Sequence, residues 1–311
     1  MAIGRSKKGF DLGPWGPLLG IVAVVVIWNL LSEYGKKHIY GREGFEDTRK
    51  EFEVVRGPSI FDDFYVSVYD DLLLNTIKNE FEIGTIVNST QPSEKSIILD
   101  IGSGTGHHVG ALQEQGYNVA GLDISPAMVK AATKNYPTAT FLQGDAEKAN
   151  FSNPSSYTHI LCLYFTIYYI KDKRQFFNNC YTWLKPGGYL VLHLVDRSAF
   201  DPILPAGSPL ALIDPQKYAA ERITQTAVEF DTQKYTADFS LDEEGDTAEF
   251  TEIFKDKTTG SVRKNVHDLY MPTQKQIIQD AREAGFIIIS HSEMSECQYR
   301  AQYLYVLQKP G

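Results

Sequence analysis

The sequence is poor in cysteine and has no excess of positive charge. Its three cysteines, Cys162, Cys180 and Cys297, form an odd set whose first two members fall in expected core elements, which suits reduced thiols rather than disulfides. Acidic residues outnumber basic ones by 39 to 30, for a formal net charge of −9. Residues 1–50 hold eight Lys and Arg against five Asp and Glu, which leaves about −12 for the remainder. An acidic body repels phosphate backbones, so nucleic acid is disfavoured as a substrate.

Residues 97–106, IILDIGSGTG, combine a short apolar run with a glycine-rich turn. The run has the length and β-branched character of a buried strand, and the glycines allow positive φ angles and close approach of a ligand to the backbone. Helix-compatible sequence follows at 107–115, so the turn would aim its backbone N–H groups at whatever lies over the strand end. The pattern indicates a nucleotide-type cofactor site.

The spacing of the glycines distinguishes between two cofactor classes. A dinucleotide site has the order Gly-x-Gly-x-x-Gly, but His107 stands at the third glycine position and Gly106 comes one residue earlier. With Asp100 the order is Asp-x-Gly-x-Gly-x-Gly, which resembles the first motif of class I S-adenosylmethionine-dependent methyltransferases. The resemblance implies that Asp100, Gly102 and Gly104 hold the methionine end of S-adenosylmethionine.

Two downstream aspartates lie where this resemblance requires them. The run 117–123 is expected to be a second strand that ends in Asp123, roughly 20 residues beyond the glycines, a spacing that suits a bidentate bond to a ribose diol. Asp145 follows an expected third strand at 138–142, and the resemblance implies that it accepts a hydrogen bond from the adenine amine. A helix cap for Asp123 and an ordinary turn for Asp145 are the structural alternatives. Further cofactor contacts are expected at Ile124, Ala146 and Leu163.

The segments 158–163 and 183–192 look like the fourth and fifth strands of the same family, the second of them containing a Lys-Pro-Gly-Gly turn. Together the motifs cover roughly 95–195. Thr158 departs from the pattern, because the family usually has an acidic residue just before the fourth strand. The resemblance implies an α/β fold with a Rossmann-like, seven-stranded class I methyltransferase sheet and helices on both faces.

An uncharged segment of 17 residues, 15–31, has Trp15 and Trp28 near its ends. As a helix it would cover about 26 Å, at the short end of a bilayer span, and interfacial positions favour tryptophan. We therefore expect an uncleaved transmembrane anchor. A cleavable signal peptide is the main alternative because basic residues precede the segment, but no small-x-small cleavage site follows it. A buried core helix is disfavoured, since the charged stretch 36–56 separates the segment from the rest.

Basic residues flank both ends of the segment in equal number, so charge does not orient it. S-adenosylmethionine is expected chiefly on the cytosolic side, and the cysteines suit reduced thiols, so we expect the membrane-anchored protein to place its catalytic body in the cytosol. Asn88-Ser89-Thr90 fits the glycosylation pattern and argues the other way, although a single match is commonly accidental.

The segment 59–79 is expected to be one helix, because apolar residues recur at steps of three and four. Its part FDDFYVSVYD, at 61–70, is similar to the lid that precedes the first motif in small-molecule N-methyltransferases, including glycine and amino-sugar enzymes. The resemblance implies that Tyr65 or Tyr69 packs over the cofactor. Half-buried helix surface is the alternative for both tyrosines.

Residues 196–272 contain a loop rich in Pro and Gly and then alternating strands around 235–241, 248–254 and 262–270. This region resembles an antiparallel β insertion after strand 5, which in similar methyltransferases forms the outer wall of the substrate pocket. A helix is expected from Thr273 to Ala284, followed by two closing antiparallel strands. Such a closing pair suits a methyltransferase better than a dehydrogenase.

Methyl transfer needs alignment of donor and acceptor, and a general base only where the acceptor must lose a proton. His193, at the end of the expected fifth strand, is the first candidate for a catalytic base, because ligands of open α/β sheets bind beyond the strand ends. A structural histidine is the alternative. His267, Glu252 and Tyr270 in the insertion are possible substrate contacts, but strand alternation alone does not say which face looks inward.

His107 and His108 resemble a metal-binding pair only superficially. Adjacent helical residues point in different directions, and no Cys or carboxylate is spaced to complete a zinc site. No metal is therefore expected.

Several absences narrow the methyl acceptor. No Asp/Asn-Pro-Pro-aromatic string follows the fourth strand, which disfavours methylases of DNA exocyclic amines and of glutamine, and no Pro-Cys pair supports cytosine C5 methylation. We expect methyl transfer from S-adenosylmethionine to a small-molecule amine or hydroxyl, or to a lipid-like acceptor presented at a membrane. The alternatives are a nicotinamide-dependent oxidoreductase, disfavoured by the glycine spacing, and a non-catalytic S-adenosylmethionine-binding module held at a membrane.

The expected organisation has a basic tail, an anchor, a charged linker and one methyltransferase domain. Their ranges are 1–14, 15–31, 32–57 and 58–311. The domain is divided into a helical lid (58–94), a cofactor-binding core (95–195), the antiparallel insertion (196–272) and a final helix with a β-hairpin (273–311).

Overall fold

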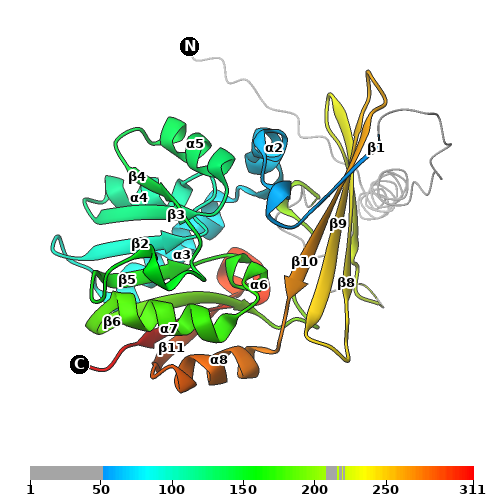
Figure 1. Ribbon diagram of the computed structural model, residues 1–311. Coiled ribbons are helices and arrows are strands. Elements are labelled where there is room, and N and C mark those ends of the chain that lie inside the picture. Colours follow the sequence, from blue (N-terminus) through cyan, green and yellow to red (C-terminus); the bar gives the residue numbers. More distant parts are fainter. Residues whose placement is uncertain (1–51, 208–215, 217–218, 220) are drawn as a thin grey trace, which may run out of the picture. The chain divides into compact units, whose positions relative to one another are not determined.

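The computed structural model describes residues 52–207, 216, 219 and 221–311, and two β-sheets organise this part of the chain (Figure 1). The larger sheet has the strand order β11-β12-β6-β5-β2-β3-β4. Its strands are β2 (Ile97–Ile101), β3 (Asn118–Asp123), β4 (Thr140–Gln143), β5 (Tyr157–Cys162), β6 (Leu184–Val195), β11 (Ile287–Met294) and β12 (Tyr299–Gln308). Five neighbouring strands of this sheet, β6, β5, β2, β3 and β4, are parallel to one another. Strand β12 is antiparallel to both of its neighbours, β6 and β11. The predicted seven-stranded sheet and its closing antiparallel pair are thus present.

Helices cover both faces of this sheet, because alternate strand residues point to opposite sides. Leu99 packs in one apolar cluster with residues of α7 and α8, and its neighbour Ile98 packs in another with residues of α3 and α4. The helices are α2 (Asp63–Leu73), α3 (Thr76–Thr90), α4 (His107–Glu114), α5 (Pro126–Asn135), α6 (Thr166–Tyr169), α7 (Lys173–Trp183) and α8 (Gln274–Glu283). Short 3₁₀ turns are η2 (Gly57–Ile60), η3 (Ala149–Phe151), η4 (Pro205–Gly207) and η6 (Ser295–Cys297).

The second sheet has five strands in the order β1-β10-β9-β8-β7. These are β1 (Phe52–Arg56), β7 (Gln225–Glu229), β8 (Gln233–Leu241), β9 (Thr247–Asp256) and β10 (Val262–Tyr270). The antiparallel insertion predicted after the fifth strand of the larger sheet is present as β7 to β10. Residues 52–56, which we assigned to a charged linker, instead form β1 and pair in parallel with β10. Three of the five residues of β1 are Phe or Val, which are enriched in strands.

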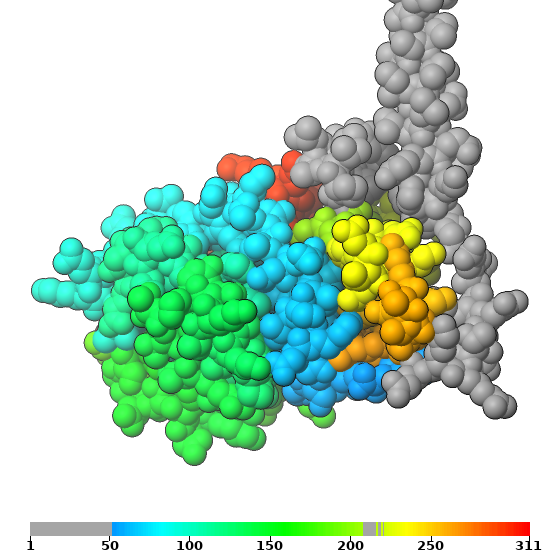
Figure 2. Space-filling model, turned by 90° about the horizontal axis from the view of Figure 1, so that it is seen from above, coloured from blue at the N-terminus to red at the C-terminus, as the bar shows by residue number. Residues whose placement is uncertain are grey.

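The predicted single helix at 59–79 is wrong, because the chain forms η2, α2 and α3 there. Two side-chain caps divide it: Asp62 accepts a hydrogen bond from the Tyr65 N–H, and Asn75 accepts one from the Lys78 N–H. Leu74, between α2 and α3, has extended backbone angles. In Figure 2 the blue residues of η2 and α2 lie between the cyan and green part of the molecule and the yellow and orange strands.

Among the described residues, no helix combines the length and the apolar character needed to cross a bilayer. The predicted basic tail, the anchor at 15–31 and most of the linker lie outside the described residues. The anchor therefore stays a prediction.

Candidate functional site

The order of the parallel strands creates a crevice beside β2. From β2 the chain moves outward to β3 and β4, then returns to β5 on the other side of β2. Ligands of open α/β sheets bind outside the carboxyl ends of the strands at such a point. A cavity of about 470 Å³ opens there, and residues of β8, β9 and β10 from the second sheet also line it.

All ten residues predicted to contact the cofactor line this one cavity. They are Tyr65, Tyr69, Asp100, Gly102, Gly104, Asp123, Ile124, Asp145, Ala146 and Leu163. These residues are distributed over 98 positions of the chain between α2 and the end of β5. The fold therefore brings together residues that the sequence keeps far apart.

The glycine-rich turn has the conformation that only glycine adopts readily. Gly102 and Gly104 have φ angles of +72° and +53°. A Cβ atom on Gly102 would lie 2.3 Å from Oγ1 of Thr166, which is the first residue of α6. The turn and α6 thus approach more closely than a side chain on Gly102 would permit.

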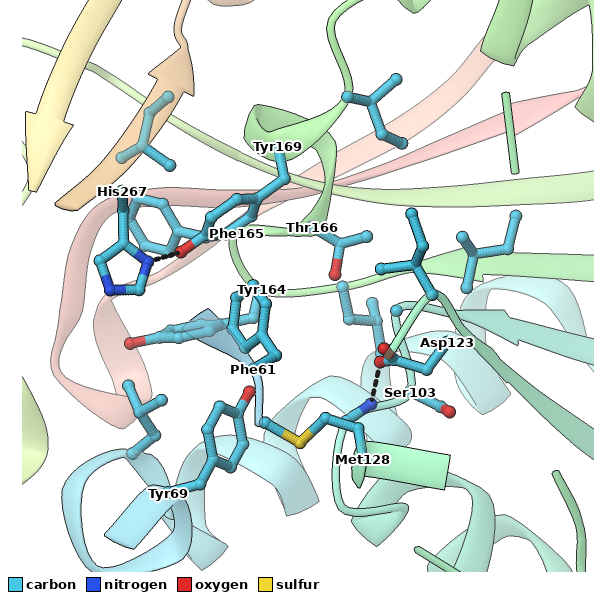
Figure 3. A pocket seen from close by; sticks show the side chains of 18 of the residues that line it. Phe61, Tyr69, Ser103, Asp123, Met128, Tyr164, Phe165, Thr166, Tyr169 and His267 are labelled. Carbon is cyan, nitrogen blue, oxygen red and sulfur yellow. Dashed lines mark hydrogen bonds between the residues drawn. The ribbon is translucent and has the colours of Figure 1, made fainter. Parts of the chain in front are cut away.

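Asp123 is tied to the same turn. One carboxylate oxygen accepts a hydrogen bond from the Gly104 N–H at 2.9 Å, shown in Figure 3, and the other accepts one from the Ser125 N–H at 2.9 Å. The cap of α5 is the Ser125 hydroxyl, which accepts from the Met128 N–H at 3.1 Å. Ser125 therefore takes the helix-cap role that was the structural alternative for Asp123. Burial raises the pKa of Asp123.

Asp100 lies at the base of the cavity and is only 3% exposed. Burial raises its pKa to about 7, opposed in part by His108. A carboxyl group with this pKa is poised to ionise when a cation is placed beside it.

Asp145 has the geometry of an ordinary turn residue, which was the alternative to a role in cofactor binding. Its carboxylate accepts a hydrogen bond from the Glu147 N–H at 2.9 Å. It nevertheless lines the cavity. Thr158, the departure from the family pattern, accepts from the Ile97 N–H at 2.8 Å and donates to the Ile97 carbonyl at 3.1 Å. Thr158 therefore joins β2 to β5 and is not one of the residues around the cavity.

Helix α2 closes one side of the cavity. The rings of Tyr65 and Tyr69 meet edge to face, with centroids 5.8 Å apart. Asp70, the next residue, accepts a hydrogen bond from the Thr105 hydroxyl at 2.7 Å and lies 3.1 Å from Nε2 of His107. The lid helix is thus attached directly to the glycine-rich turn and to the start of α4.

His193 is fully buried, and it is not among the residues that line the cavity. Its Nδ1 lies 2.6 Å from the carbonyl oxygen of Tyr164, and burial lowers its pKa to about 4. The geometry gives no support to the prediction of His193 as the catalytic base, and it favours the structural alternative.

His107 and His108 point to different partners. Nδ1 of His107 lies 2.7 Å from the Tyr136 hydroxyl, whereas Nε2 of His108 lies 2.7 Å from Glu82, a buried carboxylate that also pairs with Lys78. Each histidine is therefore engaged with its own neighbours.

Sequence reasoning missed several residues of the cavity, which come from α3, α5, α6 and the position directly after η2. They include Phe61, Lys78, Met128, Thr166 and Tyr169. The rule that ligands bind beyond the carboxyl ends of parallel strands could have indicated Thr166 and Tyr169, which follow β5 directly. The possible substrate contacts His267 and Tyr270 do line the cavity, while Glu252 lies behind His267.

Comparison with known proteins agrees with this geometry. Residues 99–192 match the sequence model of the methyltransferase domain family. The matched region is a methyltransferase domain. The predicted resemblance to methyltransferases is confirmed over these residues, which run from the first motif almost to the end of β6.

Two curated relatives share this domain. The demethylmenaquinone methyltransferase of Chlorobaculum tepidum is 35% identical over 105 residues, which are 33% of this chain and 43% of that protein. The dTDP-4-amino-2,3,4,6-tetradeoxy-D-glucose N,N-dimethyltransferase of Saccharopolyspora spinosa is 32% identical over 114 residues, 36% of this chain and 45% of that protein. The chain thus spans less than half the length of each of these relatives.

Solved structures share the fold over a longer range. The CcbJ methyltransferase of Streptomyces caelestis has a TM-score of 0.60 and 17% identity, with 81% of this chain and 98% of that chain covered. An S-adenosylmethionine-dependent methyltransferase of Clostridium acetobutylicum has a TM-score of 0.59 and 15% identity, over 80% of this chain and 99% of that one. At these identities the likeness shows the fold.

Proposed function

We propose that this protein transfers the methyl group of S-adenosylmethionine to an amine or hydroxyl of a small molecule. The observation that carries the proposal is that all ten residues expected to contact the cofactor lie around one cavity at the carboxyl ends of β2, β3 and β5. The glycine spacing and the matched domain both disfavour the nicotinamide-dependent oxidoreductase, which was the alternative.

The chemistry of the cavity fits S-adenosylmethionine. The glycines of the turn at 102–104 carry no side chains that would keep a ligand away from the backbone, and the buried Ser103 hydroxyl has no hydrogen-bond partner within the described part of the chain. Asp100 would face the methionine ammonium, Asp123 the ribose diol and Asp145 the adenine amine. When bound, the cofactor supplies an electrophilic methyl group on a sulfonium.

The acceptor end of the cavity is largely apolar and aromatic. It is formed by Phe200, Leu204, Phe239, Phe250 and Leu269, from the second sheet and the loop before it. Such a lining suits a small organic acceptor that is shielded from water during transfer. The names of the two curated relatives point to a quinone precursor and an amino sugar as the first acceptor classes to assay.

Binding of S-adenosylmethionine to the full chain by isothermal titration tests the proposal. We expect the affinity to fall at least about tenfold in Asp123→Ala, because the loss of the carboxylate removes both the ribose acceptor and the tie to the turn. Asp172→Ala is the matched control, since Asp172 also accepts a backbone N–H, at the start of α7, but does not line the cavity. No binding by the wild-type chain at millimolar cofactor would contradict the proposal.

Assays with a dTDP-amino sugar, demethylmenaquinone and simple amines and phenols then separate an enzyme from a non-catalytic module. Transfer of a labelled methyl group to any of them supports catalysis. Binding of S-adenosylmethionine without transfer to any acceptor favours the non-catalytic module.

We further propose that the N-terminal segment 15–31 anchors the protein in a membrane and leaves the methyltransferase domain in the cytosol. The uncharged sequence with flanking tryptophans supports an anchor. The three cysteines are free and buried, and Thr90 of the glycosylation pattern is buried with its hydroxyl bonded to the Ile86 carbonyl, which supports the cytosolic side. Extraction of the full chain from membranes by alkaline carbonate would contradict the anchor.

A further inference from the structure

A continuous chain of buried polar groups reaches the acceptor end of the cavity. The Tyr169 hydroxyl, at the end of α6, lies 2.8 Å from Nδ1 of His267 on β10, and Figure 3 shows this bond. Nε2 of His267 lies 2.7 Å from Oε2 of Glu252 on the neighbouring strand β9. His267 and Glu252 are 1% and 0% exposed, while Tyr169 and His267 both line the cavity. The three groups therefore connect the cavity to the interior of the second sheet.

Glu252 accepts hydrogen bonds from further donors. The Tyr235 hydroxyl donates to its Oε1 at 2.8 Å, and the Asn265 side-chain amide lies 3.4 Å from its Oε2. Asn265 in turn accepts a hydrogen bond from Arg263 Nε at 2.8 Å. Both side-chain oxygens of Glu252 are therefore engaged by buried partners.

These partners fix the direction of every hydrogen bond in the chain. A carboxylate only accepts, so Nε2 of His267 carries the proton and donates it to Glu252. Nδ1 of the neutral imidazole is then an acceptor, and the Tyr169 hydroxyl donates to it. The remaining lone pairs of the Tyr169 oxygen are left to accept a proton from a molecule in the cavity.

Tyr169 lies between the cofactor turn and the second sheet. Its helix begins with Thr166, which lies against Gly102, and its ring meets the Phe61 ring edge to face at 5.4 Å. In Figure 3, Tyr169 and His267 lie apart from Asp123 and Ser103, with Tyr164 and Phe61 between the two groups. Tyr169 and His267 thus line the cavity on the side away from Asp123 and Ser103.

We propose that Tyr169, His267 and Glu252 form a proton relay that removes the proton of the methyl acceptor, which must therefore be a hydroxyl or a primary or secondary amine. This inference rests on the proposed function. As the acceptor's nitrogen or oxygen bonds to the methyl carbon, the carbon–sulfur electron pair stays on sulfur, which leaves as a neutral thioether. The acceptor's proton moves to the Tyr169 oxygen, and the phenol's own proton moves to Nδ1 of His267. Glu252 is the positioning residue, which orients the imidazole and pairs with the imidazolium.

The environment favours this coupled movement over ionisation of the tyrosine alone. Burial raises the pKa of Tyr169 well above its ordinary value, and the charge of Glu252 raises it further. A free phenolate is therefore disfavoured in the cavity, whereas an imidazolium beside the buried Glu252 has a counter-charge.

The tautomer of His267 tests the relay without any acceptor. Long-range ¹H–¹⁵N spectra of the full chain, with the resonance assigned by its loss in His267→Asn, report which ring nitrogen carries the proton. In the neutral ring we expect the proton on Nε2, and we expect Tyr169→Phe to shift the Nδ1 resonance towards that of a nitrogen without a hydrogen bond. A proton on Nδ1 in the neutral ring would overturn the proposal.

Transfer rates provide the second test, with an acceptor that the wild-type chain methylates. Tyr169→Phe and His267→Asn should slow transfer at least about 100-fold, while the affinity for S-adenosylmethionine stays within about threefold of wild type. Glu252→Gln should slow it about tenfold and give a mixture of His267 tautomers. Tyr305→Phe, which removes a hydroxyl bonded to Gln274 away from the cavity, is the matched control and should retain the wild-type rate.

The two proposals fail in different ways. If the wild-type chain does not bind S-adenosylmethionine, the proposed function itself is contradicted. A wild-type chain that binds cofactor and transfers methyl groups, but whose Tyr169→Phe variant is equally fast, overturns only the relay.

Discussion

At the scale of single residues, Gly102 occupies a position where both the backbone angle and the packing require glycine. Its φ of +72° costs an alanine about 1–2 kcal/mol, and a Cβ would lie 2.3 Å from Oγ1 of Thr166. We expect Gly102→Ala to weaken binding of S-adenosylmethionine at least about tenfold in isothermal titration, because α6 or the turn must move. Gly116→Ala is the control, since Gly116 also has a positive φ, +88°, but nothing within 4 Å of the added Cβ. Equal affinities in the two variants would contradict a role for close packing at the turn.

Asp100 gives a prediction about pH. With a pKa of about 7 in the free protein, it is mostly protonated at pH 6, and a cofactor ammonium beside it favours the ionised form. Binding at pH 6 should therefore release close to one proton, and affinity should rise with pH up to about 7. Titration in two buffers of different ionisation enthalpy measures the released proton. The difference between buffers should disappear in Asp100→Asn, and its absence in the wild-type chain would show that Asp100 does not face the cation.

The residues that the sequence could predict are those whose role depends on their immediate neighbours in the chain. Gly102, Gly104 and Asp123 belong to strand–turn patterns that fix their position at the carboxyl end of a strand. Tyr169 and His267 could not be assigned in this way, because they are 98 positions apart and meet only when the second sheet packs beside the first. His193 does lie near the end of β6, but its side chain is fully buried with Nδ1 against the Tyr164 carbonyl, and it is not among the residues that line the cavity.

At the scale of helices and strands, the boundaries near the lid were the least predictable. Apolar periodicity continues across Leu74, so it indicates one helix over 59–79, yet the Asn75 cap starts a new helix in another direction. Asp and Asn are common at both caps and exposed helix positions, and which of the two applies depends on where the chain must turn to pack. Three strands of the insertion, β8 to β10, were predicted closely, because turn sequences separate them, whereas β7 was not predicted.

Helix α2 should behave as a lid that Asp70 holds in place. Its carboxylate accepts from Thr105 and pairs with His107, bonds whose loss we expect to cost about 1–2 kcal/mol of local stability. Asp70→Ala should therefore accelerate amide hydrogen exchange of residues 63–73 about tenfold in the free protein. The neighbouring variant Asp71→Ala removes an exposed carboxylate and should leave the exchange unchanged. Similar exchange in both variants would show that packing of α2 alone holds the lid.

At the scale of the whole molecule, the candidate site belongs to both sheets. The larger sheet and its loops supply most of the residues predicted to contact the cofactor, and the second sheet supplies the proposed acceptor wall with His267, behind which Glu252 lies. The sequence predicted the larger sheet from its motifs, but it gave no sign that the second sheet begins before the lid, at β1. A five-residue edge strand has too little periodicity to be distinguished from a linker, and its partner β10 lies more than 200 positions away.

That parallel pairing leads to a prediction about where the folded domain begins. Residues 52–56 pair in register with 262–266, and deletion of β1 exposes the edge of β10. A fragment of residues 58–311 should therefore be about 2–3 kcal/mol less stable than one of residues 50–311, because it lacks the backbone hydrogen bonds of this ladder. We expect its thermal midpoint to be about 5–10 °C lower by circular dichroism. Arg56→Ala in the longer fragment removes only exposed ion pairs with Glu249 and Asp268, so it should change the midpoint little. Equal midpoints for the two fragments would place the start of the domain after β1, as the sequence alone had indicated.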